Sequence, residues 1–358
     1  MSIQTLENVN IAGICCALPG NPIDISNIKS TFSEKELKKF TKMTGVLQVY
    51  RALPSQTASD LCFIAAEKLM NDLNWDKSTV DGLIFISQDP DYVFPATACT
   101  LQNRLGLPTT CFAFDVNLGC SGYVYGIWMA SKLASPTCRR ILLLNGDTIS
   151  FSLSPQDNSV NLLFGDAGAA TAIEFCESSG KSSFVLGTDG AGYNNLIIPG
   201  GRARNRRTQE TSIRQIDHDG VIRSQDDLYM NGVEVFNFTL REVPGIIDSV
   251  VKLHGWTDQD IDLYALHQAN KFLLEQLTRK AGIGSEKLPI NIHSFGNTSS
   301  ASIPLLLTET FNNRDASNRL NVVMAGFGVG LSWGAAALNM ERTHFSETVY
   351  LDKGGEDV

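Results

Sequence analysis

The sequence lacks any uninterrupted apolar run long enough to cross a bilayer, and no basic start followed by an apolar stretch stands at Met1. It also lacks an excess of basic residues: 29 Lys and Arg stand against 38 Asp and Glu, a formal net charge of −9. A lysine-rich tail of the kind that binds nucleic acids is missing too. We therefore expect a soluble, cytoplasmic protein that binds neither membranes nor nucleic acids.

Cysteine and histidine are present, but two familiar patterns of them are missing. The 8 cysteines and 5 histidines do not show the paired spacing of a metal site, and the cysteines do not form a disulfide framework. The glycine run at 326–330 is not a complete GxGxxG motif and precedes a strand pattern instead of a helix, which argues against dinucleotide binding. These absences predict reduced thiols, no metal and no resident cofactor.

The chain has many apolar residues (43%) and 30 glycines, enough for a large core in one domain or in two closely packed halves. Apolar spacing predicts a helix over 58–73, and an apolar run predicts a strand at 83–87. The segment 21–60 is polar and rich in Lys and Ser, so we expect it to lie on the surface.

The second half of the chain repeats the pattern of the first. Trp75 and Trp256 each follow a helical pattern, stand six residues before an Asp and lead into a strand. Each copy then continues with a helix and with a strand that ends in a glycine turn, at 119–121 and at 296–298. We expect a duplicated β/α unit in which these two turns face each other across the joint. The predicted units are an N-terminal half, a C-terminal half and an insertion within the latter: 1–180, 181–358 and around 200–227.

Cys120 is the first candidate for chemistry. An apolar run at 111–116 stops at Asn117, and an apolar-periodic run begins at Cys120, a pattern typical of a buried strand that turns into a buried helix. A thiol at a helix N-terminus faces unpaired N–H groups, which favour the thiolate, and Gly119 and Gly122 leave room for a substrate. The alternative is a core cysteine, since free cysteines are commonly buried. The cysteines outside this context are expected in the core: Cys62, Cys99, Cys111, Cys138 and Cys176.

Two further candidates follow strands in the second half. His267 comes directly after the strand pattern 263–266, and Asn297 stands in the glycine turn before a helix. Each has an ordinary alternative: His267 as a structural hydrogen-bonding residue, and the turn at Asn297 as helix capping with Pro304 in the first turn. Taken together with Cys120, they supply a nucleophile and two hydrogen-bond donors, which suits thioester acyl transfer.

These residues match a known family. From about residue 8 to 340, and in the same order, the chain resembles β-ketoacyl-[acyl carrier protein] synthase III of the thiolase superfamily. The resemblance implies an α/β fold of the thiolase type, a five-layered αβαβα arrangement that is internally duplicated. The matching motifs are Gly119-Cys120-Ser121-Gly122, His267-Gln268-Ala269-Asn270, Gly296-Asn297-Thr298-Ser299, Ala301-Ser302-Ile303-Pro304 and Gly326-Phe327-Gly328. Shorter matches occur at Thr44-Gly45, Phe94-Pro95, Phe164 to Ala169, Pro199 to Gly201 and Tyr229 to Gly232.

The resemblance implies a role for each site residue. Cys120 would accept an acyl group from a thioester, and the backbone N–H groups of Cys120 and Val329 would form the oxyanion hole. His267 and Asn297 would hold the thioester carbonyl of a malonyl-type extender while CO2 leaves, after which the carbanion attacks the acyl-cysteine. The same family would place the acyl pocket at Phe94, reaching across a homodimer interface, and Phe327.

Some positions depart from the family pattern. Where the family holds coenzyme A with a Trp and two Arg, this chain has Lys39, Met43 and Asn158, and Val329 replaces a Gly in the last glycine run. One hypothesis is that the acyl donor is a carrier protein instead of acyl-coenzyme A. The alternative is that coenzyme A is bound by Lys39 and other residues.

The expected partners are an acyl carrier protein, an acyl-CoA or acyl-carrier donor and a second copy of the chain. An acidic carrier needs a basic dock on this acidic chain, and the charged residues after His267 supply one. The favoured dock consists of Lys271, Arg279 and Lys280, and a weaker candidate consists of Arg202, Arg204, Arg206 and Arg207. The predicted function is acyl transfer with decarboxylative condensation, in fatty-acid initiation or a specialised pathway. The alternative is transfer of the acyl group to an oxygen or nitrogen nucleophile.

Overall fold

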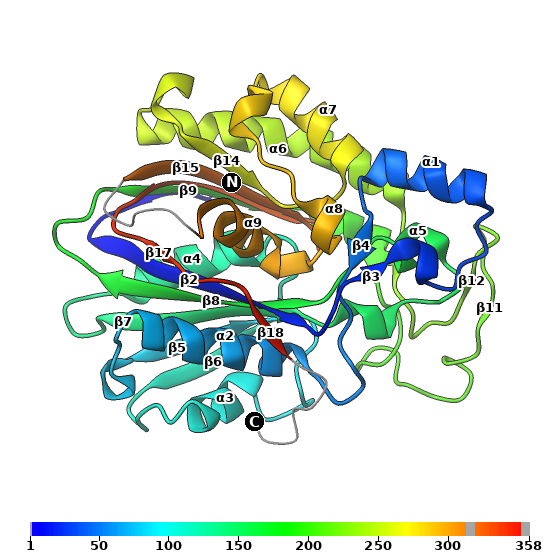
Figure 1. Ribbon diagram of the computed structural model, residues 1–358, viewed down its shortest axis with the longest axis horizontal. Coiled ribbons are helices and arrows are strands. Elements are labelled where there is room, and N and C mark those ends of the chain that lie inside the picture. Colours follow the sequence, from blue (N-terminus) through cyan, green and yellow to red (C-terminus); the bar gives the residue numbers. More distant parts are fainter. Residues whose placement is uncertain (1, 313–318, 352–358) are drawn as a thin grey trace.

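The computed structural model describes residues 2–312 and 319–351, and in this part of the chain two mixed sheets lie face to face with helices between and outside them (Figure 1). The first sheet has the order β17-β2-β8-β7-β5-β6, with β18 also paired to β2. The second has the order β1-β9-β16-β15-β14. The first-sheet strands are β2 (Val9–Pro19), β5 (Gly82–Ile86), β6 (Phe112–Val116), β7 (Arg140–Asp147), β8 (Ala167–Phe175), β17 (His344–Phe345) and β18 (Val349–Leu351). The second-sheet strands are β1 (Ser2–Leu6), β9 (Ser182–Thr188), β14 (Leu263–Leu266), β15 (Leu320–Gly328) and β16 (Ser332–Met340).

Apolar packing produces the layers. A central cluster joins both sheets through Tyr123 and Ile127 of α4 (Gly122–Leu133) and Leu306 of α9 (Ser302–Phe311). A second cluster packs α2 (Ala58–Asp72) and α3 (Thr97–Arg104) on the outer face of the first sheet. A third cluster packs α6 (Gly232–His254) and α7 (Lys271–Ala281) on the outer face of the second. The result is the predicted αβαβα stack, because each sheet is apolar on both faces and must be covered twice.

The two sheets repeat one strand arrangement, as the sequence predicts. In the first, β5 and β7 are parallel and β8 runs antiparallel to β7. In the second, β14 and β15 are parallel and β16 runs antiparallel to β15. The first strand, β1, pairs with β9 in the second sheet, whereas the last strands, β17 and β18, pair with β2 in the first.

One part of the repeat differs from the prediction. The strand expected before the turn at 296–298 is a short helix, α8 (Ile292–Phe295). The residues just before the turn include Pro289, which has no N–H to donate to a neighbouring strand, and the polar Asn291 and His293. Within residues 2–312 and 319–351 the second sheet consequently ends at β14 and has no counterpart of β6.

The segment 21–60 is also not the plain surface that its composition predicts. It contains β3 (Ile23–Asp24), α1 (Glu34–Thr44) and β4 (Gln48–Val49), and buried residues of it join Leu153 and Ile292 in a fourth apolar cluster. Phe40 is 6% exposed although four of its neighbours on α1 are lysines. This segment lies at the right-hand end of the molecule in Figure 1, together with the insertion and its strands β11 (Gln215–Ile216) and β12 (Ile222–Arg223).

The remaining small elements are found at the same end of the fold or in its connections. They are α5 (Asn158–Asn161), β10 (Leu196–Ile197) and β13 (Tyr229–Met230), with 3-10 helices at Ile25–Asn27, Lys77–Thr79, Ile149–Ser152, Gly190–Asn195, Asp258–Asp260, Ser285–Lys287 and Ser299–Ala301. Among the described helices, none is long and apolar enough to cross a membrane.

All eight cysteines lie within the described residues and are free thiols. Cys62 and Cys111 are buried, as predicted, but Cys99 is exposed and Cys138 and Cys176 are only half-buried. Cys99 is on the short helix α3, whose apolar side, carrying Ala98 and Leu101, packs inward, so the cysteine between them points outward.

Candidate active site

Cys120 lies in a tight turn between β6 and α4, as its sequence pattern predicts. The turn is closed by the N–H of Gly122, which donates to the Gly119 carbonyl at 2.7 Å. The hydroxyl oxygens of Ser121 and Ser332 lie 2.7 Å apart and tie the turn to β16. Cys120 is 7% exposed, so it sits at the bottom of a site and not on the surface.

The glycines around this turn make room for protein side chains. A Cβ on Gly119 would lie 2.3 Å from Oε1 of Gln88, and a Cβ on Gly122 would lie 2.7 Å from Cγ2 of Ile86. The expectation that these two glycines leave space for a substrate is therefore wrong. The glycine that lies against the thiol is Gly328, where a Cβ would lie 2.9 Å from Sγ of Cys120.

The thiol of Cys120 is protonated at neutral pH. Burial and the negative charge of Asp147 raise the pKa of Cys120 to about 11. The backbone N–H groups of Val329 and Cys120 and the Ser299 side chain act in the opposite direction, but more weakly. The predicted thiolate is therefore wrong for the resting protein. Burial removes the water that would stabilise a thiolate, and the N–H groups at the helix start stabilise it by a smaller free energy. The two N–H groups nevertheless favour a charged sulfur, and the oxyanion hole that they would form stays a prediction.

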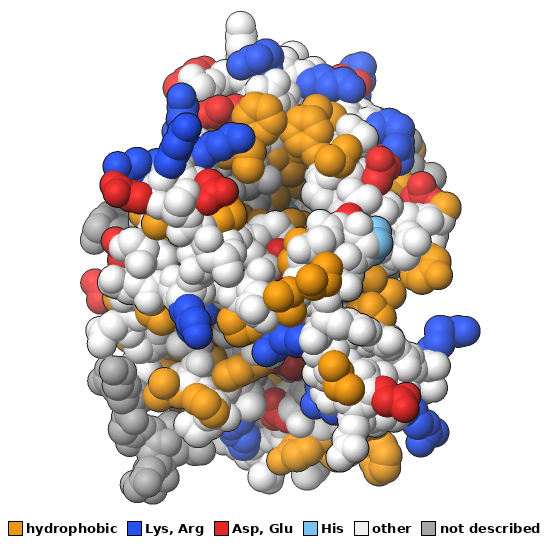
Figure 2. Space-filling view, turned by 90° about the vertical axis from the view of Figure 1, so that its right-hand side faces the viewer, with side chains coloured by type: hydrophobic (Ala, Val, Ile, Leu, Met, Phe, Trp, Pro, Cys, Tyr) orange, Lys and Arg blue, Asp and Glu red, His pale blue; other side chains and the backbone are white. Residues whose placement is uncertain are grey.

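Cys120, His267 and Asn297 line one cavity of about 560 Å³, which we call the first cavity. The glycine turns of the two halves therefore face each other, as the duplication predicts. Residues of α1, α6 and α7 form its wall, and its rim is apolar: Met43 is 50% exposed and Phe272 43%. Figure 2, which views the molecule from the right-hand side of Figure 1, shows apolar side chains gathered around a hollow in the upper part, with basic side chains nearby.

Cys120 also lines a second cavity of about 590 Å³. Asp147, Ser299 and Val329 line it close to the thiol, and Arg202 lies farther along its wall. The thiol thus borders two separate spaces.

His267 follows β14 and is held on three sides. Its N–H donates to the Ala325 carbonyl at 2.9 Å, its Nδ1 lies 2.6 Å from Oγ of Ser302, and its ring meets Phe327 edge-on with centroids 5.6 Å apart. The residue is 1% exposed, and burial lowers the pKa of His267 to about 3. His267 is therefore neutral at every working pH. If Ser302 donates to Nδ1, then Nε2 carries the hydrogen and can donate it into the cavity.

Asn297 is held through its backbone by the first half of the chain. Its N–H donates to the Leu163 carbonyl at 2.9 Å, and its carbonyl accepts from Gly165 N–H at 3.1 Å. Its side-chain Oδ1 accepts from the N–H of Ser299 at 3.0 Å. Because the oxygen is occupied, the amide nitrogen is the end that remains to donate into the first cavity.

The positions that depart from the family pattern have other partners. The side-chain nitrogen of Asn158 donates to Oγ1 of Thr31 at 2.7 Å, and its oxygen accepts from the Thr31 N–H at 3.3 Å. Met43 lines the first cavity with its apolar side chain, whereas Lys39 is exposed on α1 and lines neither cavity of the described residues.

The two residues predicted for the acyl pocket lie in different surroundings. Phe327 is 2% exposed and lines the first cavity beside His267. Phe94 is 84% exposed and lines neither cavity of the described residues, and its neighbours Tyr92 and Val93 are exposed as well. The nearby strand β6 is an edge strand with all five of its residues half-buried.

The predicted basic dock is spread along α7. Lys271 stands at its start, beside the rim residue Phe272. Arg279 and Lys280 stand in its last turn, roughly 12 Å farther along the helix at 1.5 Å per residue. Lys280 is anchored, because its Nζ donates to the Leu240 carbonyl at 2.8 Å. Of the second basic group, Arg207 forms an ion pair with Asp226 at 3.1 Å, and all four arginines are exposed: Arg202, Arg204, Arg206 and Arg207.

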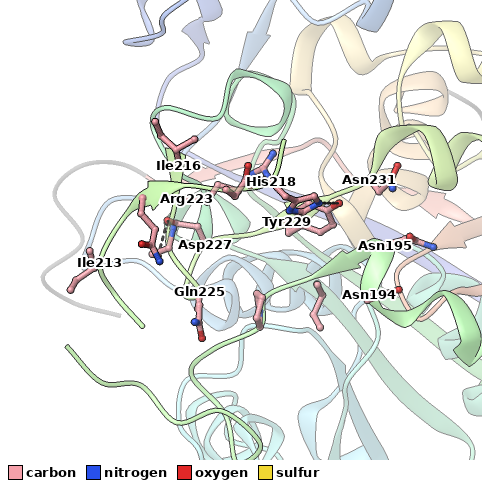
Figure 3. A pocket seen from close by; sticks show the side chains of 15 residues that line it. Asn194, Asn195, Ile213, Ile216, His218, Arg223, Gln225, Asp227, Tyr229 and Asn231 are labelled. Atoms are coloured by element: carbon pink, nitrogen blue, oxygen red, sulfur yellow. Dashed lines mark hydrogen bonds and ion pairs between the residues drawn. The ribbon is translucent and has the colours of Figure 1, made fainter. Parts of the chain in front are cut away.

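A third cavity, of about 500 Å³, lies in the insertion between the β10/β13 pair and the β11/β12 hairpin (Figure 3). Its buried Arg223 bonds to Asp157 and to Asp217, and its guanidinium lies 5.2 Å from the centre of the Tyr229 ring. These charged groups are paired with one another, and Cys120 does not line this cavity. It therefore has no part in the predicted chemistry.

Three residues of the site were not predicted as such: Asp147, Ser299 and Ser302. Ser299 and Ser302 belong to a motif that indicates helix capping, and Asp147 ends a buried strand. A buried carboxylate at a strand end is the one signal in the sequence that could have pointed to Asp147. The carboxylate of Asp166 accepts from the N–H groups of Ala52 at 2.8 Å and Ser150 at 3.0 Å, and so connects these two segments.

A buried cysteine at a helix start, a neutral histidine and an asparagine at the joint of two duplicated α/β halves define a condensing acyltransferase of the thiolase fold. Comparisons with known proteins agree. Residues 114–190 match the family model for 3-oxoacyl-[acyl-carrier-protein] synthase III, and residues 251–340 match the model for its C-terminal part. The chain belongs to the β-ketoacyl-[acyl carrier protein] synthase III family of the thiolase superfamily.

Relatives and solved structures are similar over nearly the whole chain. A putative 3-oxoacyl-[acyl-carrier-protein] synthase 3 from Campylobacter jejuni is 33% identical over 339 residues, 94% of this chain and 95% of the relative. A β-ketoacyl-[acyl-carrier-protein] synthase III from Desulfitobacterium hafniense is 34% identical over 84% of this chain and 88% of its own. The crystal structure of a 3-oxoacyl-(acyl-carrier protein) synthase from Burkholderia xenovorans has a TM-score of 0.92 at 38% identity, covering 98% of this chain and 99% of that one.

Proposed function

We propose that this enzyme joins an acyl group on Cys120 to a malonyl-type thioester with loss of CO2. The carrying observation is that Cys120, His267 and Asn297 line one cavity. In the first half-reaction the Cys120 sulfur attacks the donor thioester, and the N–H groups of Cys120 and Val329 stabilise the oxyanion. The donor thiol leaves, and the acyl group stays on the sulfur.

In the second half-reaction, Nε2–H of His267 and the amide of Asn297 hold the thioester carbonyl of the extender. As the carboxylate leaves as CO2, negative charge collects on that oxygen, and the resulting enolate attacks the acyl-cysteine carbonyl. Two neutral donors in a buried site suit this step, because they stabilise developing charge without needing protonation. Transfer to an oxygen or nitrogen nucleophile would not need this pair of donors, so the condensation is the better-supported function.

We also propose that the acyl donor arrives on a carrier protein. The rim of the first cavity is apolar at Met43, and Asn158 is already bonded to Thr31, so neither position offers a cation to a nucleotide. Lys271, Arg279 and Lys280 would form the basic dock. The unpaired cysteines fit a cytoplasmic location, where thiols stay reduced.

A homodimer completes the proposal. Phe94, Tyr92 and Val93 form an exposed apolar group beside the edge strand β6, and such a group is normally covered by a partner. We place Phe94 in the acyl pocket of the second copy. The duplicated units would then be 1–180 and 181–358, the second with its insertion around 200–227.

Intact-mass measurement tests the function and the donor together. Wild type is mixed with acetyl-CoA or with acyl-carrier donors of matched chain length, and Cys120→Ala serves as the blank. We expect a mass gain of one acyl group that needs Cys120 and forms faster from the carrier donors. Rapid and saturable loading from acetyl-CoA would refute the carrier preference, and no Cys120-dependent gain from any donor would refute the function itself.

Charge reversal on α7 tests the dock. The double variant Lys271→Glu, Arg279→Glu should bind an acidic carrier about tenfold more weakly and show a smaller dependence on salt, because two attractive charges become repulsive. Lys132→Glu, at the far end of α4 from Cys120, is the matched control and should bind normally. Unchanged carrier kinetics in the double variant would exclude this dock.

A further inference from the structure

Asp147 is a buried carboxylate beside the nucleophile that the condensation does not use. It ends β7, is 2% exposed and lines the second cavity together with Cys120. Its Oδ1 accepts from Gln88 N–H at 2.8 Å and from the Ser87 hydroxyl at 3.2 Å, and its Oδ2 accepts from the Ser300 hydroxyl at 3.1 Å. These bonds hold the carboxylate in one place.

Ser299 connects this carboxylate to the nucleophile. Its hydroxyl stabilises the charged forms of both Cys120 and Asp147, and all three residues line the same cavity. Its φ of +50° lies in the left-handed region, which is uncommon for a residue other than glycine, and its N–H is fixed on Oδ1 of Asn297. The backbone therefore adopts a costly conformation at Ser299, in the cavity wall that it shares with the Cys120 thiol and the Asp147 carboxylate.

The chemistry needs such a group. Cys120 is a protonated thiol at rest, and its proton must leave when the sulfur attacks the thioester. His267 is a weak acceptor, since burial lowers its pKa to about 3 and its Nδ1 is bound to Ser302. Asp147 is a better acceptor: burial raises its pKa to about 6, so the carboxylate is charged at neutral pH but takes a proton more readily than an ordinary Asp.

We infer that Ser299 and Asp147 form the path by which Cys120 loses its proton during acylation. The S–H bond breaks as the sulfur attacks the donor carbonyl carbon, and the proton goes to Oγ of Ser299. The hydrogen that Ser299 carried passes to the carboxylate of Asp147. When the donor C–S bond breaks, the proton returns along the same path to the leaving thiolate, so that no net charge is left in the site. This inference rests on the proposed acylation of Cys120.

Other titratable groups also face Asp147. Asp89, in the loop after β5, raises its pKa, and the thiols of Cys120 and of Cys62 on α2 interact with its charge. Asp89 is exposed and accepts from the hydroxyl of Thr148. Removing the charge in Asp89→Asn should move the fall in rate to a somewhat lower pH, and the pH dependence is assigned to Asp147 only if this variant keeps that fall.

The test is the rate of Cys120 acylation from pH 5 to 9, measured by rapid quench and intact mass. The sign follows from the direction of transfer: the carboxylate must be charged, so the wild-type rate should fall as the pH drops through about 6. Asp147→Asn should lose this fall and be slower at pH 7.5 by about 100-fold, within the range for general acid–base catalysis. Ser299→Gly, which suits the left-handed backbone but removes the hydroxyl, should be slowed similarly.

Ser152→Ala is the matched control, because Ser152 also lines the second cavity but is not among the groups that bond Asp147 or act on Cys120. It should acylate at close to the wild-type rate with the same pH profile. The inference is overturned if Asp147→Asn or Ser299→Gly acylates at the wild-type rate, or if Ser152→Ala is slowed as much as Ser299→Gly. Failure of wild type itself to become acylated would instead refute the proposed function.

Discussion

Replacing Asn297 by Ala should slow the condensation by about 10²- to 10³-fold, the usual effect of removing one donor to a developing oxyanion. It should slow the acylation of Cys120 much less, through loss of the acceptor that holds the Ser299 N–H. The side-chain oxygen of Asn297 is held by Ser299, so its amide nitrogen is the end available to the extender. His267→Ala should show the same division between the half-reactions. Each variant is measured twice: by intact mass for the acyl-enzyme and by CO2 release from a malonyl thioester for the condensation.

Asn194→Ala is the control for this pair. Asn194 lines the third cavity in the insertion, away from Cys120, and both half-reactions should proceed normally in its absence. A loss of acylation in Asn297→Ala that equals its loss of condensation would contradict the division of roles. The site would then act as a single unit in which Asn297 serves the nucleophile.

Gly328→Ala should reduce acylation of Cys120 by about 100-fold or more while the protein stays folded. A Cβ at this position would lie 2.8 Å from Cβ of Cys120 and 2.9 Å from its Sγ, closer than real Cβ contacts allow. Gly328 has a φ of 159°, which residues with a side chain rarely adopt, so the expected effect is a displaced thiol together with local backbone strain. A displacement of about 1 Å is enough to cost 100-fold in a positioned reaction. The rate of acyl-enzyme formation measures it.

Gly245→Ala provides the matched glycine. Gly245 is inside α6, and a Cβ there would meet nothing within 4 Å, so the variant should be fully active and about 1 kcal/mol more stable to unfolding. Thermal unfolding of both variants separates loss of fold from loss of site. Wild-type acylation by Gly328→Ala would mean that the thiol does not occupy this position when it reacts.

Local pattern predicts the regular parts of this fold well. The helix predicted at 58–73 is α2, and the strand at 83–87 is β5, because their apolar spacing is decided within the segment itself. The repeat between the halves is confirmed by the equivalent places of β5 and β14, β7 and β15, and β8 and β16. Composition alone was misleading for the segment 21–60, where exposed lysines on one side of α1 conceal Phe40 on the other.

The sequence by itself determined which residues meet: duplication and motif order place Cys120, His267 and Asn297 together, because corresponding turns of two stacked units share one joint. Only the tertiary structure decided the state of these residues. The protonation of each residue depends on its burial and on the charged and polar groups around it. These groups come from positions distant in the chain, such as Asp147 near Cys120 and Ser302 beside His267. Burial there makes the cysteine a resting thiol and the histidine a neutral donor, which no local pattern in the sequence could have shown.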